Sequence, residues 1–325
     1  MEADGRLDLI QFIKNAEKPL NICAPMVRYS KLPFRQLVRT YGVDIAYTPM
    51  MLADVFARSE RARDTEFTSN PKDVPVVVQF AASNPEGLAA AASLIAPYVD
   101  GIDINCGCPQ KWAISEKIGS YLMEYPDKER EVRELIRSVK QLPLQKPIPC
   151  SIKIRCHDDL RQTVEFVKRA EMANVDWITI HGRTRRQKST QPVNMEAMKL
   201  AKENATVPVF ANGDIFSLAD VQATVTQTGV NGVMAARGLL ENPALFAGYD
   251  TTPFECLEEY VRLALAYGTN SFVFHNHIKF MLDRITSRQE KRSLNHLSSV
   301  AAVLDWLEDH YGLNVRERNI SYSYK

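Results

Sequence analysis

The sequence predicts an α/β protein, a (β/α)8 TIM barrel followed by a small C-terminal all-helical domain. Two observations predict the barrel: eight short segments rich in apolar and β-branched residues occur between residues 20 and 238, and amphipathic helical segments separate them. Barrels of this kind take about 250 residues and sometimes about 200. A doubly wound open sheet is the competing layout, but no Gly-x-Gly-x-x-Gly motif follows the first predicted strand, which weakens it.

The predicted strands are mostly continuous apolar runs, as expected for strands that are buried on both faces of a parallel sheet. They span residues 20–26, 44–50, 74–82, 101–106, 149–155, 176–183, 207–215 and 232–238. Capping signals mark the helices between them. Asn84 and Pro85 open one helix, which Pro97 closes, and Ser217 opens another with Asp220 in the capping-box position. Residues 127–142 carry apolar side chains at helical spacing.

The pattern changes after residue 238, because no further strand is predicted. Pro243 and Pro253 mark a linker, and three helices are expected at residues 254–267, 272–288 and 294–311, with Gly312 as the stop. We therefore predict three parts. They are a catalytic barrel at residues 1–242, a helical domain at 243–313 and a loose tail at 314–325.

Composition excludes disordered, collagen-like and coiled-coil proteins, since 45% of the 325 residues are hydrophobic and 24% are charged. The formal net charge is only +1, so any contact with nucleic acid must rest on a local basic patch. Six cysteines without framework spacing indicate reduced thiols. The first residues do not resemble a signal peptide, and the longest apolar run is too short to span a bilayer. We predict a cytoplasmic location, with the nucleus as an alternative.

Polar residues stand at nearly every predicted strand end, where the mouth of a barrel lies. They occur in Ala24-Pro25-Met26, Gln79, Asn105-Cys106-Gly107-Cys108-Pro109, Lys153-Ile154-Arg155, His181-Gly182-Arg183, Asn212-Gly213-Asp214 and Ala236-Arg237-Gly238. A single polar residue of this kind can be explained as a buried side chain that hydrogen-bonds within the protein. Several cationic or imidazole side chains at one mouth call for an anionic ligand, because unpaired buried charge costs several kcal/mol.

The last two strand ends occupy the usual phosphate-binding corner of such barrels. Glycine lets backbone N–H groups approach phosphate oxygens, and Arg237 adds charge-assisted donors. The alternative is that the two glycines only serve tight turns. Lys153, Gln79 and His181 are donors suited to the carbonyls and ribityl chain of a flavin. A bound cofactor that carries phosphate therefore fits better than a free sugar phosphate.

The segment Asn105-x-Gly107-Cys108-Pro109 has Gly119 ten residues beyond its proline. With the other strand-end motifs in the same order, it resembles the signature of the tRNA-dihydrouridine synthases. The resemblance covers the whole barrel, and the helical C-terminal part also suits the family. Cys106 and the loop at residues 183–192 resemble the eukaryotic branch that acts on D-loop positions 20a and 20b. The implied reaction is the FMN-dependent reduction of a uridine C5–C6 bond in tRNA, with NADPH or NADH recharging the flavin.

The resemblance also implies individual roles at the cofactor. The isoalloxazine would rest on Pro25, Met26 and Val27. Gln79 would bond its pyrimidine edge, Lys153 would lie by N1 and O2, and His181 would lie near the cofactor. The ribityl phosphate would be held by Asn212, Gly213, Asp214, Ala236 and Arg237.

Cys108 would be the catalytic acid, giving a proton to C5 while flavin N5 gives hydride to C6. A free thiol is mostly protonated at pH 7, which suits this role. Asn105 would orient the uracil, and Arg155 would contact the substrate. Reaching a flavin inside the barrel requires the uridine to leave its stack, which costs a few kcal/mol.

Two basic regions are candidates for offsetting that cost by contacting the RNA backbone. One is the mouth loop with Arg183, and the other includes Arg288, Lys291 and Arg292. The alternative explanation for the second region is an ordinary solvated helix face. His275-x-His277 has the look of a ligand pair, but residues two apart on a helix point to different sides. We expect a surface or RNA-facing role for it, or none.

Other functions remain open from the sequence. Cys106, Cys108, Cys150 and Cys156 lack the usual zinc spacing, so no metal site is predicted. The alternatives are a flavin barrel acting on free pyrimidines, as dihydroorotate or dihydropyrimidine dehydrogenases do, and an inactive RNA-binding barrel. A flavin-free phosphosugar isomerase or aldolase is a weaker option. The expected partner is tRNA, with no membrane and no stable protein partner.

Overall fold

The computed structural model describes residues 7–123 and 128–313. Eight parallel strands form a closed barrel in the order β2-β1-β9-β8-β7-β6-β5-β4, and pairing of β2 with β4 closes the ring. The barrel strands are β1 Leu20–Cys23, β2 Ile45–Tyr47, β4 Val76–Ala81, β5 Gly101–Asn105, β6 Cys150–Arg155, β7 Trp177–His181, β8 Val209–Asn212 and β9 Gly232–Ala235. A two-residue strand, β3 Met51–Leu52, adds to β4. The predicted TIM barrel is confirmed, and each predicted strand is present with narrower bounds.

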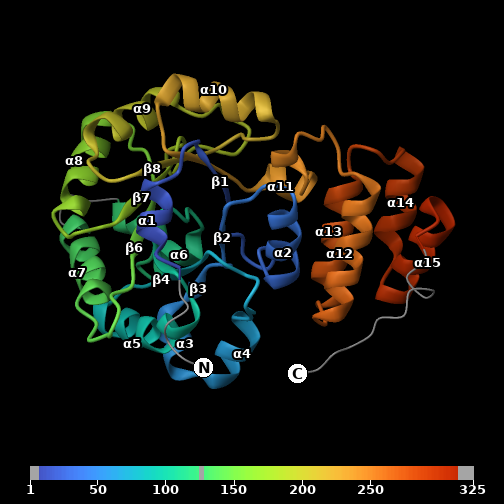
Figure 1. Ribbon diagram of the computed structural model, residues 1–325, viewed down its shortest axis with the longest axis horizontal. Coiled ribbons are helices and arrows are strands. Elements are labelled where there is room, and N and C mark those ends of the chain that lie inside the picture. Colours follow the sequence, from blue (N-terminus) through green and yellow to red (C-terminus); the bar gives the residue numbers. More distant parts are fainter. Residues whose placement is uncertain (1–6, 124–127, 314–325) are drawn as a thin grey trace.

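Helices surround the barrel (Figure 1). They are α1 Leu9–Lys14, α2 Leu32–Thr40, α3 Ala53–Arg58, α4 Glu60–Glu66, α5 Pro85–Ile95, α6 Lys111–Ser115, α7 Lys128–Lys140, α8 Leu160–Glu171, α9 Met195–Asn204, α10 Leu218–Thr228 and α11 Arg237–Glu241, with 3-10 turns η1 Ala96–Tyr98, η2 Gly119–Met123 and η3 Leu245–Ala247. Asn84 and Ser217 cap α5 and α10 as predicted, each accepting a backbone N–H bond. The Asp220 carboxylate accepts from the N–H of Phe216, so its capping box is only half formed.

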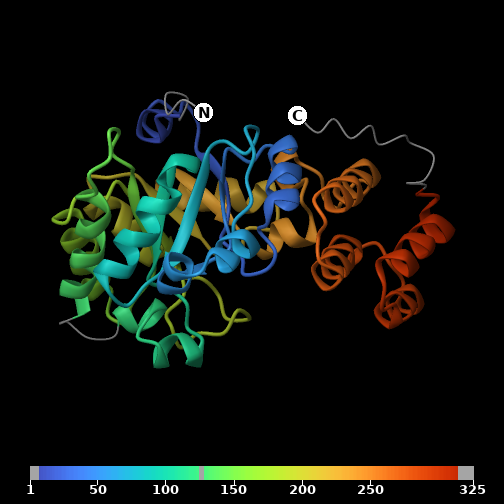
Figure 2. The same cartoon turned by 90° about the horizontal axis from the view of Figure 1, so that it is seen from below.

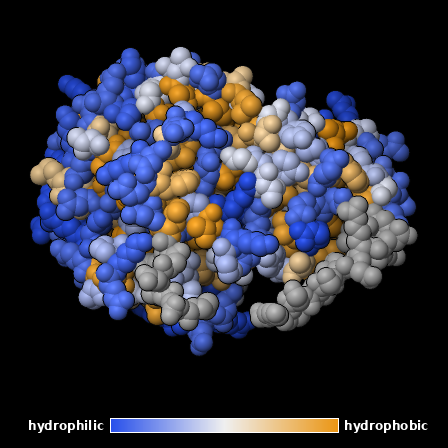
Figure 3. All heavy atoms as spheres, viewed as in Figure 1, coloured by the Kyte–Doolittle hydropathy of each residue, from blue (hydrophilic) through white to orange (hydrophobic). Residues whose placement is uncertain are grey.

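The two ends of the barrel differ. Helix α1 covers one end, where its Leu9 and Ile13 are buried against the strands. In Figure 2 the dark-blue α1 lies at one end, and the green segment that follows β5 lies at the other. That other end is where the carboxyl ends of the strands meet, and it is the mouth. Figure 3, seen as in Figure 1, faces the end covered by α1 and shows mainly hydrophilic residues there, with hydrophobic ones in small groups. Within the described residues no helix has both the length and the apolar character needed to cross a membrane.

The C-terminal part contains four helices where the sequence predicted three. They are α12 Phe254–Ala266, α13 Ser271–Leu282, α14 Arg288–His296 and α15 Val300–Tyr311. The predicted helix at 272–288 ends early because Ser287 and Glu290 form a complete capping box that starts α14. Ser299 caps α15, and Gly312 ends it in the left-handed conformation, as predicted. Residues 314–325, predicted to be a loose tail, lie outside the described residues.

The helical part packs on the flank of the barrel through α12 and α13, which contact α2 and α11. His277 of α13 is fully buried at this contact, stacked on Phe34 at 4.7 Å between ring centroids and edge-on to Tyr29. Its Nε2 bonds the Tyr29 carbonyl oxygen at 3.1 Å, and burial lowers the pKa of His277 to about 3. Figures 1 and 2 show α14 and α15 on the side of α12 and α13 away from the barrel.

Candidate active site

Most of the residues predicted for the site come from loops and strand ends at the mouth. Those near one another there are Pro25, Met26, Val27, Gln79, Asn105, Cys108, Lys153, Arg155, His181, Arg183, Asn212, Gly213, Asp214, Ala236 and Arg237. The topology explains this grouping, because every strand of the barrel is parallel and ends on the same side. Arg288, Lys291 and Arg292 do not join them, since they lie on α14.

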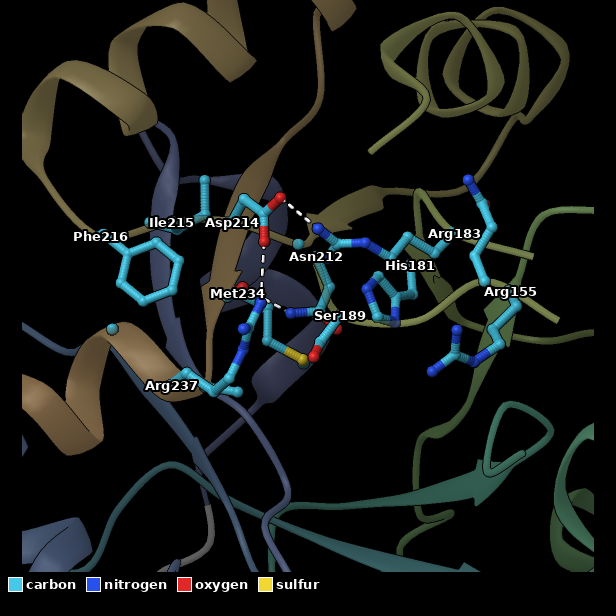
Figure 4. A pocket seen from close by; sticks show the side chains of 14 residues that line it. Arg155, His181, Arg183, Ser189, Asn212, Asp214, Ile215, Phe216, Met234 and Arg237 are labelled. Carbon is cyan, nitrogen blue, oxygen red and sulfur yellow. Dashed lines mark hydrogen bonds and ion pairs between the residues drawn. The ribbon is translucent and has the colours of Figure 1, made fainter. Parts of the chain in front are cut away.

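A cavity of about 480 Å³ opens between the ends of β6, β7, β8 and β9. Figure 4 shows Arg155 and His181 on one side of it and Arg237 and Phe216 on the other. Its lining includes Gly213, Asp214, Ala236 and Gly238, so it coincides with the predicted phosphate corner.

The cavity is electropositive, because Arg155, Arg183 and Arg237 line it against a single carboxylate among the described residues. The pKa of His181 falls to about 2, first because the ring is buried and then because Lys153, Arg155, Arg183 and Arg237 surround it. Burial, with Arg155 next, lowers the pKa of Lys153 to about 8. His181 is therefore neutral at physiological pH, and the site favours an anion that would restore charge balance.

Asp214 is the one carboxylate among the described residues of this cavity, and it joins two arginines. It accepts from Nη2 of Arg237 at 2.9 Å and from Nη2 of Arg183 (Figure 4). Gly213 and Asp214 both have positive φ, at 130° and 51°, which turns this loop sharply beneath the cavity. Arg237 keeps unused donors and a half-exposed side chain, whereas Arg183 is 2% exposed.

Arg183 was predicted to contact substrate, and the structure places its donors within the protein. Besides Asp214, its Nε bonds the carbonyl oxygen of Gln191 at 2.6 Å. The guanidinium thus fastens the loop after β7 to the loop after β8. Its exposure leaves little surface for RNA, so the geometry favours a role in orienting Asp214.

Lys153 and Asn212 bond each other across the mouth, with Lys153 Nζ donating to Asn212 Oδ1 at 2.8 Å. The Nδ2 of Asn212 donates to the Met234 carbonyl oxygen at 2.8 Å, which fixes the orientation of its amide. On the opposite side, Met26 has its N–H bonded to Ser30 Oγ, while Val27 is 53% exposed. Pro25 precedes them at the end of β1.

The loop that carries Cys108 is held on both sides. Its N–H donates to Asn105 Oδ1 at 3.0 Å, and its carbonyl oxygen accepts from Ser120 N at 2.9 Å. Gly119 allows this close approach: it has φ of +66°, and an added Cβ would lie 2.7 Å from the Cys108 oxygen. Arg155 Nε bonds the Gly107 carbonyl oxygen at 2.7 Å. Cys108 is half-buried at the mouth, unlike the fully buried Cys106.

Gln79 lies deeper than the predicted flavin contact suggests, with 1% exposure. Its Nε2 donates to Asp103 Oδ2 at 2.7 Å, and its Oε1 accepts from Asn105 Nδ2 at 2.8 Å. Sequence reasoning missed Asp103. The available signal was a carboxylate in the middle of the apolar strand Gly101–Asn105, where an unpaired charge is costly. Burial raises the pKa of Asp103 to about 6.

His275 and His277 both make hydrogen bonds within the protein, and the surface or RNA-facing role is wrong for the buried His277, while for the half-buried His275 it stays a prediction. His275 Nε2 bonds the Leu294 carbonyl oxygen at 2.8 Å, while His277 is enclosed against the barrel. On α14, Lys291 pairs with Asp283 at 2.9 Å, and Arg288 and Arg292 are exposed. Across residues 7–123 and 128–313, no three His, Cys, Asp or Glu side chains gather in a way that could hold a metal ion.

The sequence matches a family model over almost its whole length. Residues 22–309 match the model described as dihydrouridine synthase. The chain belongs to the dihydrouridine synthase family. The resemblance stated from the motifs is thereby confirmed.

Relatives of high identity carry related names. A Mus musculus protein named tRNA-dihydrouridine(20a/20b) synthase (NAD(P)+)-like is 50% identical over 90% of this chain and 89% of its own length. A Schizosaccharomyces pombe protein named tRNA-dihydrouridine(20a/20b) synthase (NAD(P)+) is 44% identical over 92% of this chain and 90% of its own.

Solved structures support the fold. A 2-naphthoyl-CoA reductase superposes with a TM-score of 0.53 at 9% identity, covering 69% of this chain and 49% of that one. An old yellow enzyme homologue from Zymomonas mobilis gives 0.50 at 9% identity, covering 69% of this chain and 86% of that one. At these identities the likeness concerns the barrel alone.

Proposed function

We propose that this chain reduces the C5–C6 double bond of uridine 20a or 20b of tRNA, with FMN bound in the barrel mouth and NADPH or NADH as reductant. The coarser statement is confirmed: the chain is a tRNA-dihydrouridine synthase, an oxidoreductase of that family. The choice of positions and of NAD(P)H follows the names of the mouse and fission yeast relatives. The electropositive cavity, which Arg155 links to the Cys108 loop, is the observation that carries the cofactor assignment.

The residues of the mouth fit FMN. Cationic side chains outnumber carboxylates there, and after burial these cations are the second cause of the lowered pKa of His181. The phosphate would be held by Arg237 and the backbone of residues 212–214 and 236, with Asp214 fixing the arginine. The ring system would rest on Pro25, Met26 and Val27, with Lys153 at its polar edge, while the enclosed Gln79 would lie behind that edge. When bound, FMN supplies the hydride that uridine C6 requires.

The chain's own contribution to the reduction is a positioned proton donor. Cys108 is half-buried in a loop whose N–H and carbonyl groups are both hydrogen-bonded, so its thiol has a defined place at the mouth. We assign it the transfer of a proton to C5. Arg155 ties the same loop to the Thr184 carbonyl oxygen at 3.0 Å and lines the cavity, which suits contact with the substrate.

Binding of tRNA is assigned to the mouth and to the exposed basic residues of α14. Arg288 and Arg292 are exposed at the start of this helix, and Lys291 lies between them in sequence. Contacts to phosphate from such side chains are additive and salt-dependent. We expect no stable protein partner to be required.

A paired measurement tests the proposal. The purified protein should be yellow and should bleach with NADPH. It should form dihydrouridine in tRNA that lacks this modification, and it should not reduce free uracil. Cys108→Ala should keep the flavin and lose most tRNA reduction, while Cys156→Ala, a control at a buried cysteine near the mouth, should lose little. A colourless protein, or a Cys108→Ala variant with full activity, contradicts the assignment.

A further inference from the structure

A buried chain of hydrogen bonds runs from the Cys108 loop into the barrel interior. Asn105 Oδ1 accepts from the N–H groups of Gly107 and Cys108 at 3.1 and 3.0 Å. Asn105 Nδ2 donates to Gln79 Oε1, Gln79 Nε2 donates to Asp103 Oδ2, and Asp103 Oδ1 accepts from Ser151 Oγ at 2.6 Å. The chain therefore begins at a carboxylate and ends at the backbone of Cys108.

Every member of this chain is removed from water. Asp103 and Ser151 are 0% exposed, Gln79 is 1% exposed and Asn105 is 8% exposed. Strand register places the first members side by side, since Gln79 pairs with Asp103 and Asp103 with Ser151 in β4, β5 and β6. In such an environment each bond depends on its neighbours, and an unpaired donor or acceptor is costly.

The direction of the chain matters because a side-chain amide has a donor end and an acceptor end. An ionised carboxylate only accepts, so Asp103 requires the NH2 group of Gln79 to face it. The Oε1 of Gln79 then faces Asn105, whose NH2 must turn toward it. That leaves Asn105 Oδ1 facing the N–H of Cys108. If both amides were reversed, the NH2 group of Asn105 would face the backbone N–H groups of Gly107 and Cys108, and donors would meet donors.

We propose that Asp103 is a positioning residue for tRNA reduction: its carboxylate sets the direction of the Gln79 and Asn105 amides and thereby holds the Cys108 loop in place. The proposal rests on the role assigned to Cys108 above. It gives a function to a buried carboxylate that the reaction does not otherwise use, and it concerns only residues of this chain.

Asp103→Asn tests it, because asparagine keeps the shape and can present either end of its amide to Gln79. Ser151→Ala is the matched control: it removes the other bond to the same carboxylate but leaves the direction of the amides unchanged. Four quantities are compared in the holoenzyme. They are the free energy of unfolding, the rate of flavin reduction by NADPH, the rate of tRNA reduction by the reduced enzyme, and the rate at which iodoacetamide labels Cys108 without tRNA.

For Asp103→Asn we expect tRNA reduction to slow by up to about 100-fold, which a displacement of about 1 Å in a reacting group can cost. Flavin reduction by NADPH, which needs no proton from Cys108, should stay within about threefold of the wild type. Labelling of Cys108 should rise severalfold as its loop loosens. Ser151→Ala should lose stability but keep its tRNA-reduction and labelling rates.

The double variant Gln79→Glu with Asp103→Asn moves the carboxylate from position 103 to position 79, where it again accepts from the NH2 group of Asn105. The direction of the Asn105 amide is thereby restored, so with FMN in excess this variant should regain tRNA reduction. The proposal is overturned if Ser151→Ala slows tRNA reduction as much as Asp103→Asn does, or if the double variant binds FMN yet is no faster than Asp103→Asn. A wild-type protein that fails to form dihydrouridine would instead refute the proposed function, so the two failures are distinct.

Discussion

Replacing Gly119 with alanine perturbs Cys108 without changing the chemistry of its side chain. Gly119 has φ of +66°, and a Cβ there would lie 2.7 Å from the Cys108 oxygen and 2.9 Å from the Cys108 Cβ. Gly229, the stop of α10, has φ of +67° with nothing within 4 Å of the added Cβ. The two glycines therefore have nearly the same φ and differ in whether an added Cβ would collide with a neighbouring residue, which makes Gly229→Ala a matched control.

The expected magnitudes follow from these contacts. An alanine in the left-handed region costs about 1–2 kcal/mol, so both variants should lose about that much free energy of unfolding. Carbon atoms prefer about 3.5–4.0 Å, so Cys108 must move by about half an ångström or more in Gly119→Ala. Because a displacement of about 1 Å in a catalytic group costs up to about 100-fold in rate, we expect about a tenfold loss here.

The assay separates stability from positioning. Urea unfolding gives the free energy for each variant, and single-turnover reduction of tRNA by the prereduced enzyme gives the rate that depends on Cys108. Gly229→Ala should keep the wild-type rate despite its lower stability. Equal rates for the two alanine variants would refute the claim that Gly119 serves the placement of Cys108.

Two further predictions concern charge. Burial holds the pKa of Lys153 at about 8, and the electronegative polar edge of a bound flavin favours its protonated form. FMN binding at pH 8 should therefore take up about half a proton, and clearly less at pH 6.5; calorimetry in two buffers of different ionisation enthalpy measures this, and zero uptake at pH 8 contradicts it. Replacing Arg288, Lys291 and Arg292 together by glutamine should weaken tRNA binding about 10-fold or more at low salt, flatten its salt dependence and leave FMN content unchanged; unchanged affinity in a filter-binding titration would remove α14 from the RNA surface.

The barrel could be predicted from the sequence because its strands are continuous apolar runs bounded by turn residues. The helical part was harder, since α14 has a single buried residue, Leu294, and therefore almost no apolar periodicity. Its start was visible all the same, in the spacing of Ser287 and Glu290. Weighing that capping box above the hydrophobic pattern would have predicted α14 as a separate helix, whereas the predicted helix at 294–311 is in fact divided between His296 and Val300.

The mouth residues could be predicted because strand ends of a parallel barrel converge. Their partners could not, because partners depend on register and loop path. The bond from Gln79 requires that Asp103 stand beside it on β5, and the bond from Ser151 requires that Asp103 also stand beside β6. The pairing of Arg183 with Asp214 requires two loops to meet, and no spacing in the sequence specifies that.

The aromatic contact between α13 and the barrel has a consequence for substrate choice. His277 is enclosed by Phe34 and Tyr29 and remains uncharged at any physiological pH, so the contact between α13 and the barrel does not weaken by protonation in that range. If α14 binds tRNA as proposed, this contact carries it on the same body as Cys108. The distance from the RNA backbone at α14 to the reduced uridine would then contribute to the choice of uridine.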